Sequence, residues 1–351
     1  MKKRLSVMLA AALSAGMLTS CGTTAVVAVP QPTQEPVATQ PPQVGTGEAV
    51  KTGLSVVTGV SESKSATEQA GVAQADITLV AVTVNDAGVI ESCVIDSIQA
   101  KVEFDASGVV TSDLTAAVPS KNKLGADYGM GKYSGIGKEW NEQAQALADY
   151  VEGKTLEQVQ GIAITEDGKA GDADLNASVT IAVAGYITAI EAAVENATHL
   201  GAKSGDTLSL TTLTSIGSSK NSTTEESGLA QVDTNVAAVT MDGDVITSCS
   251  IDSVQAKVNF DSTGTITTDL TAPQLSKNQL GDEYGMKKYS GIGKEWNEQA
   301  AAFCQYVAGK TVDEVAGIAV TEEGKAADAD LAASVTVSLG GFQALIAKVA
   351  G

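Results

Sequence analysis

The stretch Lys132-Tyr133-Ser134-Gly135-Ile136-Gly137-Lys138-Glu139-Trp140 recurs without a change from Lys288 to Trp296. Outward from it, two copies align at a constant offset of 156 residues from Cys93 to about Asn196. Each copy is about 150 residues long, which is the length of an ordinary domain rather than of a solenoid repeat. We therefore predict two homologous domains, residues 53–200 and 205–351.

Within a copy, runs of β-branched residues flank Asn/Asp/Gly turns, a pattern that predicts β-hairpins. Helical spacing follows, because Trp140, Ala144, Leu147 and Val151 fall at i, i+4, i+7 and i+11. The elements expected in the first copy are strands at 76–84, 89–95, 98–104, 109–111 and 178–183, and helices from Trp140 onward and at 155–160 and 186–197. The predicted fold is α+β, with a mostly antiparallel sheet and packed helices in each domain.

The charge excludes several classes of protein. The chain has 42 acidic and 22 basic residues, a net charge of −20, and its single arginine is Arg4. Without residues 1–20 it keeps 19 lysines and a net charge of −23, which argues against nucleic-acid binding. His199 is the only histidine, so two copies of a histidine-based catalytic or zinc site are excluded.

The N-terminus has the features of an export signal. Lys2, Lys3 and Arg4 precede an apolar stretch, and Leu18 to Cys21 resembles the bacterial lipobox, at which the signal is cut and the cysteine is lipidated. We predict a signal peptide at 1–20, a lipid anchor on Cys21, and a Pro/Gln/Thr-rich tether at 21–52. The protein is then a bacterial envelope lipoprotein that faces away from the cytoplasm.

The repeated glycine-lysine stretch is the first candidate site. Glycines ahead of a helix bring backbone N–H groups close to an anion, and lysines add positive charge. The candidate residues are Gly135, Gly137 and Lys138 in the first copy and Gly291, Gly293 and Lys294 in the second. The alternative is a tight entry turn with Trp140 as a core anchor.

The second candidate site is Asp172-Ala173-Asp174-Leu175-Asn176-Ala177-Ser178-Val179-Thr180, repeated with one substitution from Asp328 to Thr336. It resembles the modification motif of the FMN-binding domain family of extracytoplasmic electron carriers, Asp-Ala-x-Ser/Thr-Gly-Ala-Thr-x-Thr, whose threonine receives FMN through a phosphoester bond. The resemblance places the acceptor at Ser178 and Ser334 and the motif's aspartate at Asp172 and Asp328. Leu175-Asn176 and Leu331-Ala332 replace the Ser/Thr-Gly pair.

The resemblance implies FMN as cofactor, a flavin transferase or a redox partner, and an electron carrier outside the membrane. The alternative is a non-redox ligand-binding or interaction lipoprotein on the same scaffold, with Asp172 and Asp174 ending a surface loop. Either way we expect a carrier or binding protein rather than a catalyst, with no catalytic residues assigned.

Cysteines and carboxylates give weaker signals. Cys93 and Cys249 occupy equivalent strands and are expected to be buried free thiols, with a disulfide between the domains as the alternative. Cys304 replaces Ala148 and has no counterpart. Asp96 and Asp252 are interpreted as solvated residues near turns, and no metal site is expected.

Overall fold

The computed structural model describes residues 47–350, and these belong to one compact unit. The predicted signal peptide, the lipidation site Cys21 and most of the predicted tether lie outside the described residues. The last part of that tether is structured, since strand β1 begins at Lys51.

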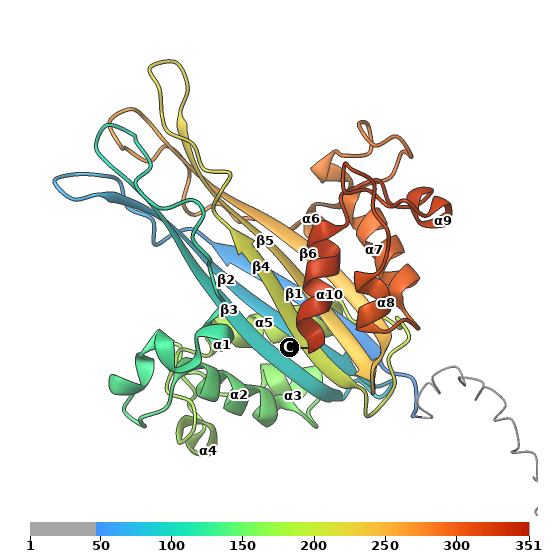
Figure 1. Ribbon diagram of the computed structural model, residues 1–351. Helices are drawn as coiled ribbons and strands as arrows, with labels where there is room; N and C mark the ends of the chain where they lie inside the picture. The colour runs from blue at the N-terminus through green and yellow to red at the C-terminus, as the bar shows by residue number, and fades with distance from the viewer. Residues whose placement is uncertain (1–46, 351) are drawn as a thin grey trace, which may run out of the picture. The chain divides into compact units, whose positions relative to one another are not determined.

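Each repeat is a three-stranded antiparallel sheet followed by helices, as predicted (Figure 1). In the first repeat the elements are β1 Lys51–Gly59, β2 Gly71–Val84, β3 Ile90–Phe104, α1 Lys121–Leu124, η1 Gly125–Tyr128, η2 Met130–Lys132, α2 Trp140–Val151, α3 Leu156–Gln160, α4 Ala173–Asn176 and α5 Ala184–Glu195. In the second they are β4 Thr207–Ser215, β5 Gly228–Asp242, β6 Val245–Phe260, α6 Lys277–Leu280, η3 Gly281–Tyr284, α7 Trp296–Val307, α8 Val312–Ala316, α9 Ala329–Ala332, α10 Gly340–Ala347 and η4 Lys348–Ala350.

The predicted hairpin around Asn85 is confirmed as β2 and β3, although β3 runs without a break through Asp96 and Ser97. The edge strands β1 and β4 were not predicted. Each pairs with the next strand along the chain, across loops that carry no tight-turn signal.

The predicted strand at residues 178–183 is wrong. This segment is irregular, with the side chains of Val179 and Val183 buried in the core of the first repeat. The backbone N–H groups of Thr180 and Ile181 donate to the side-chain oxygen of Gln143 instead of to a neighbouring strand. The alternating apolar residues, which resembled a strand, are loop residues whose side chains are buried in the core.

Each sheet buries apolar side chains on both of its faces, and the two faces belong to different hydrophobic clusters. Their outward side chains pack against the helices of their own repeat, so that Val82 and Cys93 of the first sheet contact the helix that carries Trp140 and Leu147. The second repeat has an equivalent cluster. The opposite faces of both sheets form one further cluster, whose fully buried residues come from the strands and strand ends of both repeats.

The shared cluster makes the two repeats an internal pseudo-dimer. The rings of Phe104 and Phe260, which are equivalent residues, stack with centroids 4.1 Å apart and planes 2° from parallel. The N–H of Ala66 donates to the carbonyl of Gly264, and the equivalent N–H of Ser222 donates to the carbonyl of Gly108. Each repeat thus gives the other the same contacts, as in a two-fold interface.

The predicted boundary between 200 and 205 falls in a segment that pairs with the start of β1. The N–H of Val50 donates to the carbonyl of Ala202, and the Thr52 and Ser248 hydroxyl groups are 2.7 Å apart. The interface across which the two repeats meet is part of the hydrophobic core.

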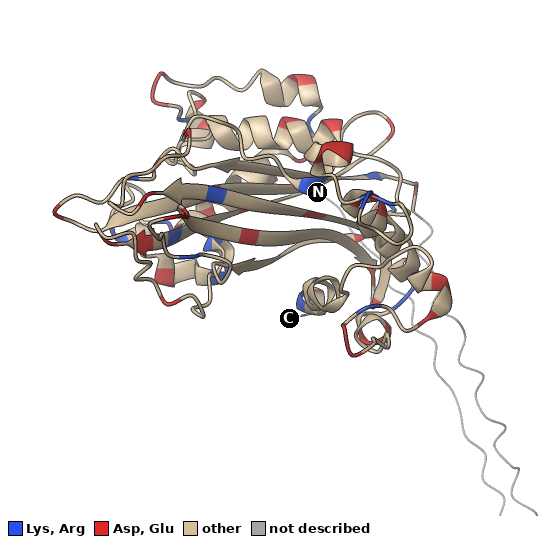
Figure 2. Ribbon diagram, turned by 90° about the horizontal axis from the view of Figure 1, so that it is seen from above, with Lys and Arg blue, Asp and Glu red and all other residues tan. Residues whose placement is uncertain are grey.

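Acidic residues are spread over the helices and loops of both repeats rather than gathered in one patch (Figure 2). Among residues 47–350, no helix combines the length and the apolar content needed to cross a bilayer.

Candidate functional site

The chain's own carboxylate caps the helix N-terminus that was a candidate site for an anion. Glu139 is the N-cap of α2, and its Oε2 accepts the N–H of Met130 at 2.8 Å. In the second repeat the carboxylate of Glu295 is buried and accepts the N–H groups of Met286 and Lys287, both at 2.8 Å. A carboxylate at the N-cap already complements the positive end of each helix dipole, and the lysines are the cations left for an anionic ligand.

The predicted glycines shape a surface turn. Gly135 is exposed, and Gly137 has φ of +67°, a left-handed conformation that favours glycine. The N–H of Gly137 donates to the carbonyl of Ser134. Gly291 and Gly293 repeat this arrangement. These glycines form the tight entry turn that was the alternative interpretation.

The predicted aspartates are helix caps. The carboxylate of Asp172 accepts the N–H groups of Asp174 and Leu175 at the start of α4, and Asp328 accepts the N–H of Leu331 at the start of α9. Ser178 and Ser334 follow these short helices and are half-buried. Within residues 47–350, neither serine hydroxyl makes a hydrogen bond, so both are free to react or to bind.

A buried glutamine that sequence reasoning missed joins the two candidate stretches. Gln143 is fully buried, and its Nε2 donates to the Ser134 hydroxyl and the Lys138 carbonyl, both at 3.1 Å. Its Oε1 accepts the N–H and hydroxyl of Thr180. Gln299 makes the same bonds in the second repeat. The signal was available, because Trp-Asn-Glu-Gln follows the repeated glycine-lysine stretch in both copies.

An exposed tyrosine stands on the loop that this glutamine holds. Tyr133 is 88% exposed and the equivalent Tyr289 is 81% exposed, although aromatic rings are usually buried. The Lys288 ammonium lies 4.9 Å from the centroid of the Tyr289 ring. Each repeat therefore presents an uncovered ring beside a lysine, and the glutamine connects this loop to the loop after the free serine.

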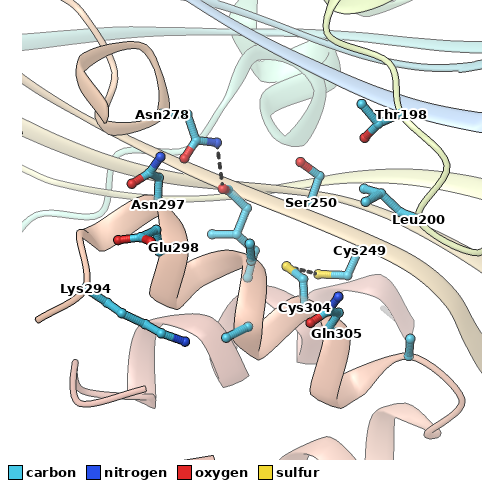
Figure 3. A pocket seen from close by; sticks show the side chains of 14 residues that line it. Thr198, Leu200, Cys249, Ser250, Asn278, Lys294, Asn297, Glu298, Cys304 and Gln305 are labelled. Carbon is cyan, nitrogen blue, oxygen red and sulfur yellow. Dashed lines mark hydrogen bonds between the residues drawn. The ribbon is translucent and has the colours of Figure 1, made fainter. Parts of the chain in front are cut away.

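A pocket recurs at equivalent positions on α2 and α7. In the first repeat it has a volume of about 520 Å³. In the second its volume is about 530 Å³, and Figure 3 shows its lining. The shared positions are Asn122/Asn278, Lys138/Lys294, Asn141/Asn297, Glu142/Glu298, Gln145/Ala301, Ala146/Ala302 and Asp149/Gln305. Of the predicted site residues, only the two lysines line this pocket.

One asparagine that lines each pocket has an unsatisfied side-chain acceptor. Within residues 47–350, the side-chain oxygens of Asn141 and Asn297 are buried and have no hydrogen-bond partner. Buried polar atoms without a partner are uncommon in folded proteins and often mark a site for water, an ion or a ligand. The amide of the neighbouring Asn122 is fixed, because its Nδ2 donates to the Ile95 carbonyl at 2.8 Å, and Asn278 is held in the same way.

The two pockets differ at their far walls. The first is lined there by Gln145 and Asp149, whereas the second has Ala301 and Gln305 and extends to Cys249 and Cys304. The second pocket is therefore the less acidic and more apolar of the two.

A buried carboxyl group in each repeat accepts the backbone N–H of the pocket's Asn122 or Asn278, contrary to the expectation that Asp96 and Asp252 are solvated. Both aspartates are about 95% buried. The carboxylate of Asp252 accepts the N–H groups of Ser253 and Asn278. Burial raises the pKa of Asp252 to about 6, although hydrogen bonds from Ser276, Asn278 and Ser253 and the charge of Lys277 oppose the rise. The pKa of Asp96 is raised for the same reason.

Ser120 and Ser276 are buried N-caps of α1 and α6. The lysine that follows each of them lies over two aromatic rings. The Lys277 ammonium is 4.7 Å from the Trp296 ring centroid and 5.0 Å from that of Tyr284. Lys121 contacts Tyr128 and Trp140 in the same way. Burial lowers the pKa of Lys277. These contacts pin the loop before α7 onto the core and so position the pocket's Asn278.

Within residues 47–350, no group of three or more histidine, cysteine or acidic side chains is placed to hold a metal ion. Comparisons with protein-family models, curated proteins and solved structures gave no significant match to this chain.

Proposed function

We propose that the protein is a lipid-anchored envelope protein that binds one small zwitterionic molecule in each repeat. The recurrence of the pocket at seven equivalent positions, with the same unsatisfied asparagine oxygen, carries this proposal. A lysine and a glutamate line both pockets, so a ligand with a carboxylate and an ammonium group matches their charges.

Thermal unfolding of the full chain with and without each free α-amino acid tests this function. A ligand that binds only the folded state raises the unfolding temperature in proportion to its occupancy. We expect at least one amino acid to raise it by a few degrees in the wild type and not in Lys138→Ala/Lys294→Ala. The control is Lys132→Ala/Lys288→Ala, which removes exposed lysines outside the pocket and keeps the effect. If no amino acid shifts the wild type, the proposal fails.

A second candidate function is flavin carriage, which the free hydroxyl groups of Ser178 and Ser334 favour. The exposed rings of Tyr133 and Tyr289 offer stacking surfaces, and nearby lysines offset a phosphate. In this account a flavin, once attached, supplies the redox chemistry and the chain's residues position it. Co-expression with a flavin transferase gives a mass adduct in the wild type and none in Ser178→Ala/Ser334→Ala. An unmodified wild-type chain contradicts this candidate.

The envelope location is tested separately. If the Leu18 to Cys21 signature is a lipobox, native protein partitions into detergent and Cys21→Ala abolishes this or blocks processing. Wild-type protein that is wholly soluble with an unmodified N-terminus would refute the anchor and leave both binding sites untouched.

A further inference from the structure

Two buried thiols meet between a strand and a helix of the second repeat. Cys249 lies on β6 and Cys304 on α7, and their sulfur atoms point toward one another 2.9 Å apart (Figure 3). They are 3% and 6% exposed, and both are free thiols in this structure. A disulfide bond needs the sulfur atoms to come to about 2.05 Å, a small further movement.

The first repeat has no such pair. Cys93 is equivalent to Cys249, but Ala148 stands where the second repeat has Cys304. Cys93 is a free buried thiol, so the disulfide considered between Cys93 and Cys249 is not formed in this structure. Among residues 47–350, the hydrogen-bond partner of the Cys249 side chain is the cysteine that the first repeat lacks.

We propose that Cys249 and Cys304 form a disulfide in the mature protein, which joins β6 to α7. The bond forms by exchange with an external disulfide of the thiol-oxidoreductase class. One cysteine thiolate attacks that disulfide and releases one thiol, and the second cysteine then displaces the other. Two protons and two electrons pass from the cysteines to the external disulfide, which becomes two thiols.

The surroundings of the pair indicate when the bond forms. Exchange requires the thiolate, and burial together with the neighbouring Cys249 raises the pKa of Cys304. The folded, reduced pair is therefore slow to react. The bond forms while α7 is still loose during folding in an oxidising compartment, and it then resists reduction. It is a structural disulfide beside the second pocket, and its formation does not depend on a ligand.

Peptide mapping of the full chain purified from its own envelope tests this. The chain is alkylated under denaturing, non-reducing conditions before digestion. We expect Cys93 to be alkylated and Cys249 and Cys304 to be recovered in one cross-linked pair of peptides that reduction separates. Recovery of both as alkylated peptides overturns the proposal. Refolding with oxidised glutathione provides a second arm that does not depend on where the protein resides, and the same cross-link is expected there.

The repeats supply a matched control. Cys304→Ala installs the residue of the first repeat, and it should melt about 5 to 10 °C below the oxidised wild type and level with the reduced wild type. Ala148→Cys recreates the pair with Cys93 and should give a second cross-link. The disulfide is refuted if Cys304→Ala has the same unfolding temperature as the oxidised wild type. It is also refuted if Ala148→Cys leaves Cys93 as a free thiol.

Discussion

At the scale of single residues, the candidate site depends on polar side chains buried inside the core. Gln143 and Gln299 each hold two loops together, and Asp96 and Asp252 anchor the loop before the helix. Such groups stay buried because nearly every polar atom has a partner. Within residues 47–350 the exceptions are the Thr58 hydroxyl and the amide oxygens of Asn141 and Asn297, and the two asparagines line equivalent pockets.

The buried carboxyl of Asp252 predicts a pH dependence of stability. Its folded-state pKa, about 6, lies above the ordinary value of 3.8, so the folded state holds a proton that the unfolded state releases. Its contribution is complete below about pH 4 and is lost as the pH rises through 6, a change of about 3 kcal/mol. Asp252→Asn removes this dependence. Urea unfolding between pH 4 and 7 should show the wild type losing stability relative to the variant, whereas a constant difference would contradict this.

Sequence reasoning located the loops of the site but not what holds them. It singled out Lys138 and Lys294, because the stretch repeats without change, and both lysines line the recurring pocket. It missed Gln143, since a glutamine on a helix normally faces solvent, and its burial depends on loops that come from 134 and 180. It also took Asp96 for a surface residue, because the strand that buries it was expected to break there.

At the scale of elements, helices were predicted better than strands. The apolar spacing of Trp140, Ala144, Leu147 and Val151 is local, and all four lie on the observed helix, which begins at Trp140 as predicted. Strand β1 pairs with β2 across a long loop, so its register depends on contacts that no local pattern encodes. The segment at 178–183 failed because buried valines in a loop resemble a strand.

The start of β2 offers a test of this packing. Gly71 faces Phe104 across the sheet, and a Cβ there would lie 2.3 Å from the ring. Gly228 faces Phe260 in the same way, at 2.2 Å. Gly71→Ala should therefore push the ring out of its stack and lower the free energy of unfolding by about 3 kcal/mol. Gly59→Ala, which meets no atom within 4 Å, is the control. Equal urea midpoints for the two variants would show that the stack is not constrained.

At the scale of the whole molecule, the described chain is a pair of repeats that close on each other. Phe104 and Phe260 stack where equivalent residues meet, and the cluster around them belongs to both repeats. The repeat could be predicted from the sequence, but the packing of the two sheets on each other could not. Alternation of apolar and polar residues along a strand shows that one face of a sheet is buried, but it does not show what covers that face.

Separated repeats should therefore associate. A fragment of residues 47–204 exposes its half of the shared cluster, and so does 205–351. We expect the mixed fragments to elute as a one-to-one complex that melts cooperatively, and each fragment alone to self-associate or to lose its cooperative transition. Two monomeric fragments that melt cooperatively and ignore each other in size-exclusion chromatography would show that the domains are independent.

If each repeat carries its own ligand, intact-mass measurement of the full chain from its native envelope should detect both ligands directly. Under native conditions the account predicts two adducts of equal mass, which Lys138→Ala/Lys294→Ala loses and Lys132→Ala/Lys288→Ala keeps. Under denaturing conditions a bound zwitterion leaves, whereas a flavin on Ser178 and Ser334 stays attached. A chain that shows only its bare mass under both conditions would contradict the account.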